Sequence, residues 1–104
     1  MIVVPSSSIA GKKVVETLGL VKGNTIRATH VGMDLMAVLK NILGGEIPEY
    51  TKLMAEAREQ SLDRMIAMAE GMGANAILDV QFSTSYIMGN AAEILVYGTA
   101  VRVE

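Results

Sequence analysis

Cysteine and tryptophan are absent from the 104-residue chain, and histidine occurs once, as His30. Without cysteine there is no disulfide framework and no thiolate nucleophile. A structural zinc site takes four cysteine or histidine ligands, which one chain of this composition does not supply. These absences exclude disulfide-stapled scaffolds, thiol enzymes and zinc-finger modules, and they lead us to expect a cytoplasmic protein.

Positive charge and long apolar runs are also scarce. Nine lysines and arginines face eleven acidic residues, and no basic stretch or tryptophan favours a nucleic-acid partner. The longest apolar stretch, residues 33–43, is interrupted by Asp34 and Lys40 and is far shorter than the roughly 20 residues that span a membrane. The first residues lack the basic lead of a secretion signal. We therefore expect neither a nucleic-acid nor a membrane partner.

Apolar residues, by contrast, are abundant for so small a chain. They make up 51% of it, and the mean hydropathy is +0.39. The length suits one domain over residues 1–104, and the interior of such a domain is small relative to its surface. Some apolar side chains then lie on the surface, which predicts contact with other copies of the chain.

The first half of the chain predicts short strands followed by a short helix. An apolar run at residues 2–4 and β-formers across residues 12–31 indicate strands, with Gly23-Asn24 as a turn that divides the second region. Residues 33–43 place their apolar side chains on one broad helical arc. Asp34 lies in the first turn of that helix, where it complements the helix dipole.

A long helix is expected over residues 49–72, with a polar outer face and an apolar inner arc. Arg58 and Arg64 fall on the apolar side of that helix. A guanidinium placed there needs an acceptor or must reach water, because an unpaired buried charge is very costly. The apolar arc also holds four methionines: Met54, Met65, Met68 and Met72.

The last third of the chain predicts a hairpin. Gly71 and Gly73 suit the end of the long helix, and residues 80–88 alternate as a strand with one apolar face. A turn at Gly89-Asn90 leads to a strand over residues 93–103, which is apolar on both faces and is therefore expected to be central or covered. Gly98 within that strand indicates a bulge or the close approach of another backbone.

The expected element order is β-β-β-α-α-β-β. It is typical of an α+β fold in which an antiparallel sheet packs on a long helix, with extra N-terminal strands and a short helix. The stretch GGEIPEY, residues 44–50, joins the two helices, with glycines that suit a helix C-cap and Pro48 at the start of the next helix. A phosphate-binding loop would need a preceding strand and a following lysine or serine, so this stretch is interpreted as a turn.

Four pieces of the sequence, in this order and at these intervals, resemble the YbjQ-like family of small bacterial and archaeal proteins, which is often labelled heavy-metal-binding. They are GGEIPEY at residues 44–50, AEAREQSLDRM at 55–65, MGANAILDV at 72–80 and GTAVRV at 98–103. The resemblance covers nearly the whole chain. It implies a dodecin-like subunit assembled into a ring, a homopentamer, and it implies no established activity.

The resemblance also has departures at charged positions. Glu46 stands where many relatives have arginine, and Asp79 stands where many have glycine. Gln81 and Ser83 occupy positions that are often acidic in relatives. These changes lower the number of carboxylates on that strand and count against an acidic metal site there.

Metal ligands remain unknown from the sequence, and so does any cofactor. His30 and Asp34 are four residues apart and could meet at a helix start, but two ligands do not complete a site. The methionines of the long helix are soft donors suited to Cu(I). Helical packing alone produces the same spacing, so core or interface methionines explain this pattern as well.

Arg58 is the main candidate for ligand binding, together with Tyr50, Asp34 and Glu46. If Arg58 is buried, it needs a partner, for which Asp34, Glu46 and Asp79 are the candidates. If it is open to solvent in a pocket near Tyr50, an anionic ligand becomes the better explanation. No nucleophile with an adjacent base is found in the sequence, so no catalytic residue is predicted.

The sequence supports two functional hypotheses. The first is a non-catalytic, ring-forming cytoplasmic protein whose partner is itself and whose subunit interfaces hold a small ligand, a metal or nothing. The alternative is an enzyme or sensor with an anion-binding site shared between subunits, built from Arg58, Tyr50 and Asp34.

Overall fold

The structure, a computed structural model, describes residues 1–28, 48–88 and 91–104, with the backbone alone for residues 48–50 and 88. The expected helix at 33–43 and the turn at Gly89-Asn90 lie outside the described residues. The elements in chain order are β1 (Ile2–Val3), β2 (Val14–Ala28), α2 (Pro48–Gly71), β3 (Ala76–Met88) and β4 (Ala91–Val103).

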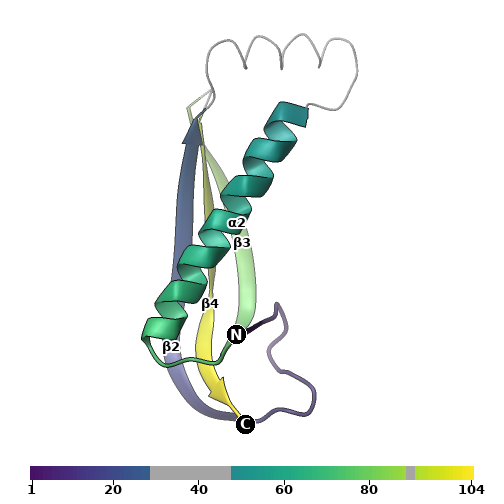
Figure 1. The fold of residues 1–104 in the computed structure, drawn as a ribbon, viewed down its shortest axis with the longest axis vertical. Coiled ribbons are helices and arrows are strands. Elements are labelled where there is room, and N and C mark those ends of the chain that lie inside the picture. The colour runs from purple at the N-terminus through teal and green to yellow at the C-terminus, as the bar shows by residue number, and fades with distance from the viewer. Residues whose placement is uncertain (29–47, 89–90) are drawn as a thin grey trace.

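The four strands form one sheet in the order β1-β3-β4-β2, and α2 runs obliquely across one face of it (Figure 1). The strand at the C-terminus, β4, is central, as its two apolar faces predicted. It pairs antiparallel with both β3 and β2, whereas β1 pairs parallel with the start of β3. The α+β class is therefore confirmed. The sheet is mixed, not antiparallel throughout, because the N-terminal segment runs alongside β3 in the same direction.

The expected turn at Gly23-Asn24 is wrong. Both residues lie inside β2, a single strand of 15 residues that pairs with β4 from Val14 to Ala28. Gly23 is buried, and a Cβ atom built on it would collide with the carbonyl oxygen of Ser61 and lie 2.6 Å from the backbone nitrogen of Met65. The glycine is needed because the backbones of β2 and α2 touch at this point, and not because the chain reverses.

Gly98 behaves as the sequence predicted. A Cβ atom on it would lie 2.8 Å from Cγ2 of Ile77 and 3.0 Å from the carbonyl oxygen of Leu78. Opposite Gly98 the pairing of β3 with β4 shifts between Leu78 and Gln81, which marks a bulge. Asp79 sits in this bulge with a φ of 54°, in the left-handed region that glycine adopts most readily.

The core lies between α2 and the sheet. The fully buried side chains in this layer come from β2, α2, β3 and β4, so each of these elements contributes to one cluster. Ala69 and Ala100 are small enough to let the helix approach the sheet closely, and Met65 is the largest side chain of the same buried cluster. The cluster consists of Val21, Met65, Ala69, Ile77, Val96 and Ala100.

The long helix is confirmed, with bounds one residue from those expected, and it ends as the glycines predicted. Gly73 has a φ of 86°, and its N–H donates to the carbonyl of Glu70 at 3.0 Å. The N–H of Ala74 donates to the carbonyl of Ala69, also at 3.0 Å. This pair of bonds is the Schellman arrangement, which satisfies carbonyls at the helix end and turns the chain into β3.

Gly23→Ala is expected to lower the free energy of unfolding by about 3 kcal/mol, because α2 must move away from β2 to make room for one methyl group. Urea denaturation at a fixed protein concentration measures the change. Gly71→Ala is the matched control. A Cβ on Gly71 meets no atom within 4 Å, so this variant should equal or slightly exceed the wild type in stability. Equal stability of Gly23→Ala and the wild type would contradict the backbone contact.

Candidate functional site

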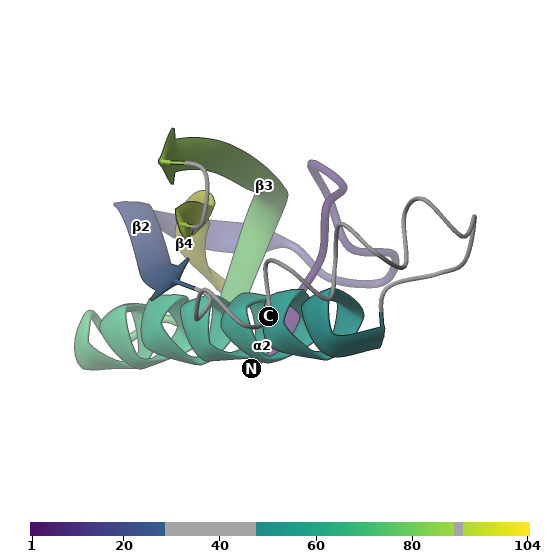
Figure 2. The same cartoon turned by 90° about the horizontal axis from the view of Figure 1, so that it is seen from above.

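The single described helix covers only part of the sheet. Its buried line, Ala57, Ser61, Met65 and Ala69, faces β2 and β4. Seen from above, α2 lies beneath these two strands, while β3 curves away from the helix toward its C-terminal end (Figure 2). Most of β3 beyond the bulge therefore has no described helix over it.

Ser61 is the one buried polar residue of the helix line, and it is fully satisfied. Its hydroxyl lies 2.9 Å from Oγ1 of Thr25, 2.9 Å from the carbonyl oxygen of Ala57 and 3.1 Å from that of Ile94. None of these groups is a general base, so the arrangement does not activate Ser61 as a nucleophile. The serine instead ties the helix to β2 and β4 through a buried hydrogen-bond network.

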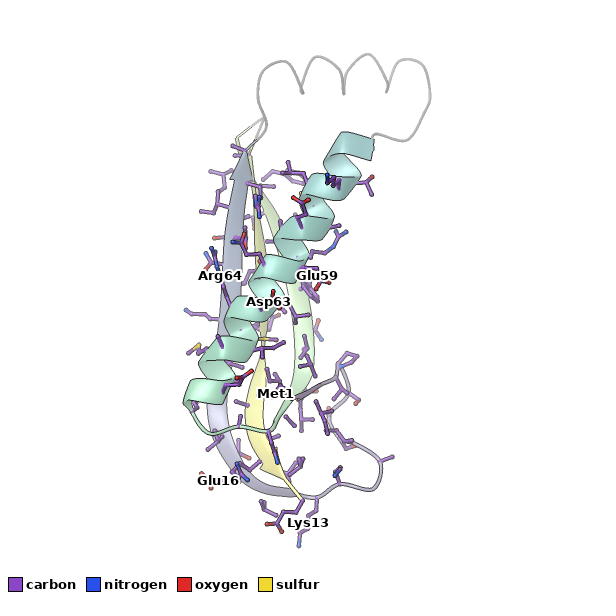
Figure 3. All side chains as sticks on the ribbon, in the orientation of Figure 1. Met1, Lys13, Glu16, Glu59, Asp63 and Arg64 are labelled. Atoms are coloured by element: carbon purple, nitrogen blue, oxygen red, sulfur yellow. The ribbon has the colours of Figure 1, made fainter. Side chains whose placement is uncertain are left out.

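One flank of α2 overhangs β2, the outermost strand on that side. Nη1 of Arg64 donates to the carbonyl oxygen of Asn24 at 2.6 Å, and Nη2 of Arg27 donates to Oε1 of Gln60 at 2.7 Å. Figure 3 shows Arg64 on the β2 side of the helix. Arg64 thus finds the acceptor that the sequence requires, and it stays exposed because β2 is an edge strand and this flank is open to water.

The other flank of α2 carries Arg58, Leu62 and Ile66, each one residue after a member of the buried line. Leu62 and Ile66 are half-buried against the core, whereas Arg58 is exposed. Among the described residues no acceptor contacts the Arg58 guanidinium. Asp79, one of its expected partners, instead accepts a hydrogen bond from Oγ of Ser7 at 2.6 Å. Arg58 is therefore exposed among the described residues, and its expected pairing with Asp34 or Glu46, which lie outside them, stays a prediction.

The face of β3 on the helix side is apolar and exposed. Phe82, Thr84 and Tyr86 lie opposite Val96, Ile94 and Ala92 of β4, which are buried under the helix, so their side chains share that face. Phe82 is nevertheless 49% exposed and Tyr86 is 82% exposed. The sequence correctly predicted one apolar face on this strand, but it gave no signal that the chain's own helix leaves that face uncovered.

The opposite edge of the sheet also exposes large apolar side chains. On β2, Leu20 is 63% exposed and Ile26 is 58% exposed. Both point to the face away from the helix, since they alternate with Val21 and Thr25, which are buried beneath it. β2 and the part of β3 that extends beyond β1 thus each present apolar surface to solvent.

The remaining predicted ligands are not brought together by the described part of the chain. Asp34, Glu46 and His30 lie outside it, and so does the side chain of Tyr50. Within residues 1–28, 48–88 and 91–104, no three His, Cys, Asp or Glu side chains gather at a position suited to a metal ion. No described helix is long and apolar enough to cross a membrane.

The methionine stripe is divided by the fold. Met65 is fully buried in the core, whereas Met68 is 44% exposed and Met72 is 37% exposed. The interpretation as core methionines is therefore confirmed for Met65 and wrong for Met68 and Met72, for which an interface position stays a prediction. The helix crosses the sheet obliquely, so its C-terminal turns carry these two side chains to the rim of the core.

Comparison with known proteins gives both a family and a fold. Residues 1–104 match the YbjQ family model, described as "Putative heavy-metal-binding". A UPF0145 protein of Dehalococcoides mccartyi is 57% identical over 104 residues, covering all of both chains. One from Methanosarcina acetivorans is 50% identical over 103 residues, covering 99% of this chain and 97% of the relative.

A crystal structure of a protein of unknown function from Pediococcus pentosaceus, in the DUF74 family, has the same fold. Its TM-score is 0.62 at 14% sequence identity, with 100% of this chain and 98% of that chain covered. At that identity the likeness concerns the fold alone. With a family match over its full length and relatives half or more identical in bacteria and archaea, the chain belongs to the YbjQ family of UPF0145 proteins.

Proposed function

We propose that this chain is a non-catalytic, self-assembling subunit that forms a closed ring of identical copies in the cytoplasm. The observation that supports the proposal is the exposed apolar surface of β2 and of the part of β3 beyond β1, in a sheet that the described helix covers only in part. Isolated exposed apolar residues are ordinary, but sets of them on two opposite edges are typical of surfaces that meet other subunits. The resemblance to a dodecin-like pentamer supports five copies.

The free energy gained by burying the exposed apolar side chains shows what else the contact between subunits requires. Fully burying a large apolar side chain contributes about 1.5–3 kcal/mol, so half-exposed ones contribute roughly 1 kcal/mol each. Burying the five most exposed apolar side chains of β2 and β3 then contributes roughly 5 kcal/mol. This gain only matches the lower end of the free-energy cost of association. These side chains are Leu20, Ile26, Phe82, Tyr86 and Ile87. Stable assembly therefore needs backbone hydrogen bonds or helix packing in addition to these side chains.

A ring of this kind gives the protein sites that one chain lacks, since any small ligand would lie between subunits. The family description names heavy metals, which prefer thiolate, thioether and imidazole donors. The chain has no cysteine and one histidine, and the described residue with the most buried thioether, Met65, is enclosed in the core. The described donor set does not fit a soft metal within one chain, and we derive no role through one.

Metal binding has a direct test. The purified protein is dialysed to equilibrium against Cd²⁺ or Cu(I), with the free metal at a tenth of the protein concentration or below. No metal is expected to be retained, because exposed thioethers alone bind weakly. Cu(I) retained by the wild type but lost in Met68→Leu would contradict this expectation. Met65→Leu serves as the control, since its thioether is buried and cannot reach the ion without unfolding.

The alternative is an enzyme or sensor with an anion-binding site shared between subunits, using Arg58, Tyr50 and Asp34. The exposure of Arg58 and the lack of a described partner for its guanidinium favour this alternative over a purely structural arginine. Guanidinium groups bind carboxylates and phosphates through paired hydrogen bonds.

Inorganic phosphate separates the two functions. Under the non-catalytic proposal, calorimetric titration with phosphate is expected to give no heat above dilution in the wild type and in Arg58→Ala. Saturable binding in the wild type that disappears in Arg58→Ala, and that persists in Arg102→Ala, would favour the anion site. Arg102 is a suitable control because its guanidinium already donates to the carbonyl of Gly73 at 2.8 Å.

The assembly itself is tested by molar mass. Size-exclusion chromatography with light scattering is expected to give a discrete species of five times the chain mass of 11.1 kDa, unchanged over a wide dilution range. A larger discrete assembly of another size would keep the ring and change its number of copies, whereas a dimer would contradict the ring. A single 11.1 kDa species at all concentrations would refute self-assembly.

A further inference from the structure

We propose that residues 81–87 of β3 pair edge to edge with β2 of a second copy, in parallel, so that the sheet continues from one subunit to the next. This contact rests on the proposed function and identifies the surface through which it is achieved. The partner is another copy of this chain, because the two edges involved occur on opposite sides of the same sheet.

The outer edge of β3 is occupied only at its beginning. Ile2 and Val3 of β1 pair with Ala76 and Ile77, and the N–H of Val80 donates to the carbonyl of Val4 at 3.2 Å. Past Val80, no described residue hydrogen-bonds to this edge. Backbone groups alternate along a strand, so the outward N–H of Val80 is followed by outward N–H groups at Phe82, Thr84 and Tyr86.

This free edge lacks the features that usually prevent an edge strand from pairing with another chain. Residues 81–87, QFSTSYI, contain no charge, no proline and no glycine, and they are rich in aromatic, β-branched and hydroxyl side chains. Natural sheets usually protect an exposed edge with lysine, proline or a bulge. β3 shifts register against β4 twice, once before this segment at Asp79 and once at its end between Tyr86 and Met88, so the pairing is regular from Gln81 to Tyr86.

The opposite edge of the sheet is formed by β2, and its direction matches. Both β2 and β3 run antiparallel to β4, so they run parallel to each other. The carbonyl oxygen of Asn24 points away from β4, since Arg64 reaches it from the rim of the helix. If a second copy is rotated about an axis close to the strand direction, the outer edge of its β2 therefore lies beside the free edge of β3 in the first copy, and the two strands run parallel.

The number of unpaired edges decides between this contact and a two-fold dimer of β3 with β3. A two-fold contact would pair β3 but leave the outer edge of β2 unpaired in every copy. A head-to-tail contact of β3 with β2 pairs both edges at once. Repeated around an axis it closes into a ring, so that no edge remains unpaired.

The spacing of the layers explains why aromatic residues occupy β3. In the continued sheet each copy contributes β2, β4 and β3 side by side, so the helices of neighbouring copies would lie about 14 Å apart. Helices that pack directly on each other lie about 8–10 Å apart. The difference is about the thickness of one large side chain. Phe82 and Tyr86 fill it between Leu62 of their own helix and the Arg64 flank of the second copy's helix, where a guanidinium can pack on an aromatic face.

The first experiment places one charge on the free edge. Thr84 is exposed, lies between Phe82 and Tyr86 and has an outward N–H, so Thr84→Lys is expected to fold normally as a single chain. Burying its unpaired ammonium should raise the dissociation constant of the assembly about a hundred-fold or more. Ala67→Lys adds the same charge on the exposed outer face of α2 and is expected to assemble as the wild type does.

For both variants, light scattering measures the molar mass of the assembly and far-UV circular dichroism measures the helix content. A monomeric Thr84→Lys with wild-type helix content supports the contact. A wild-type assembly that Thr84→Lys leaves intact overturns the contact while keeping the proposed function. A wild type that is itself monomeric overturns both.

Cross-linking then identifies the partner edge, since the chain has no cysteine of its own. Asn24→Cys and Ser83→Cys are both exposed and on the face away from the helix. The two single variants, refolded together and treated with a short bismaleimide, are expected to give a covalent heterodimer. Each variant treated alone is expected to give none. A covalent dimer from Ser83→Cys alone would show a two-fold β3 contact and overturn the proposal.

Discussion

The contact between the backbones of β2 and α2 at Gly23 determines the layout of the whole subunit. Because no side chain separates Gly23 from Ser61 and Met65, the helix axis is pressed against β2. The Ser61 hydroxyl, placed between Thr25 and Ile94, fixes the helix along the same line. A helix about 10 Å wide spans about two strands at 4.8 Å, so seating α2 on β2 and β4 leaves β3 without a described helix over it.

The apolar surface of the chain follows from this placement. Met65 and Ala69 enter the core, whereas Phe82 and Tyr86 face the side from which a second helix would have to come. The chain has no other described helix to supply, and a helix from another copy fits the vacant position. In this account the apolar excess of the sequence and the exposed edge of β3 have one cause, namely a subunit whose layers are completed by its neighbours.

The sequence predicted those features that depend on local chemistry. The long helix, its glycine-containing end, the central position of β4 and the close approach at Gly98 all followed from patterns within a few residues. Gly23-Asn24 misled because a glycine that permits a turn and a glycine that permits close packing look the same in sequence. The exposure of Arg58 could not be predicted because helical periodicity shows which residues share a side, but not whether a strand beneath that side is covered.

Residue-resolved hydrogen exchange of the wild type tests the central claim most directly. The amides of Phe82, Thr84 and Tyr86 point outward, so in an isolated chain they exchange rapidly, while those of Ser83 and Ser85 are protected by β4. If the sheet continues into a second copy, all five amides are protected at high protein concentration, and the outward three lose protection when the assembly dissociates. Rapid exchange at Phe82, Thr84 and Tyr86 within an intact assembly would contradict the account.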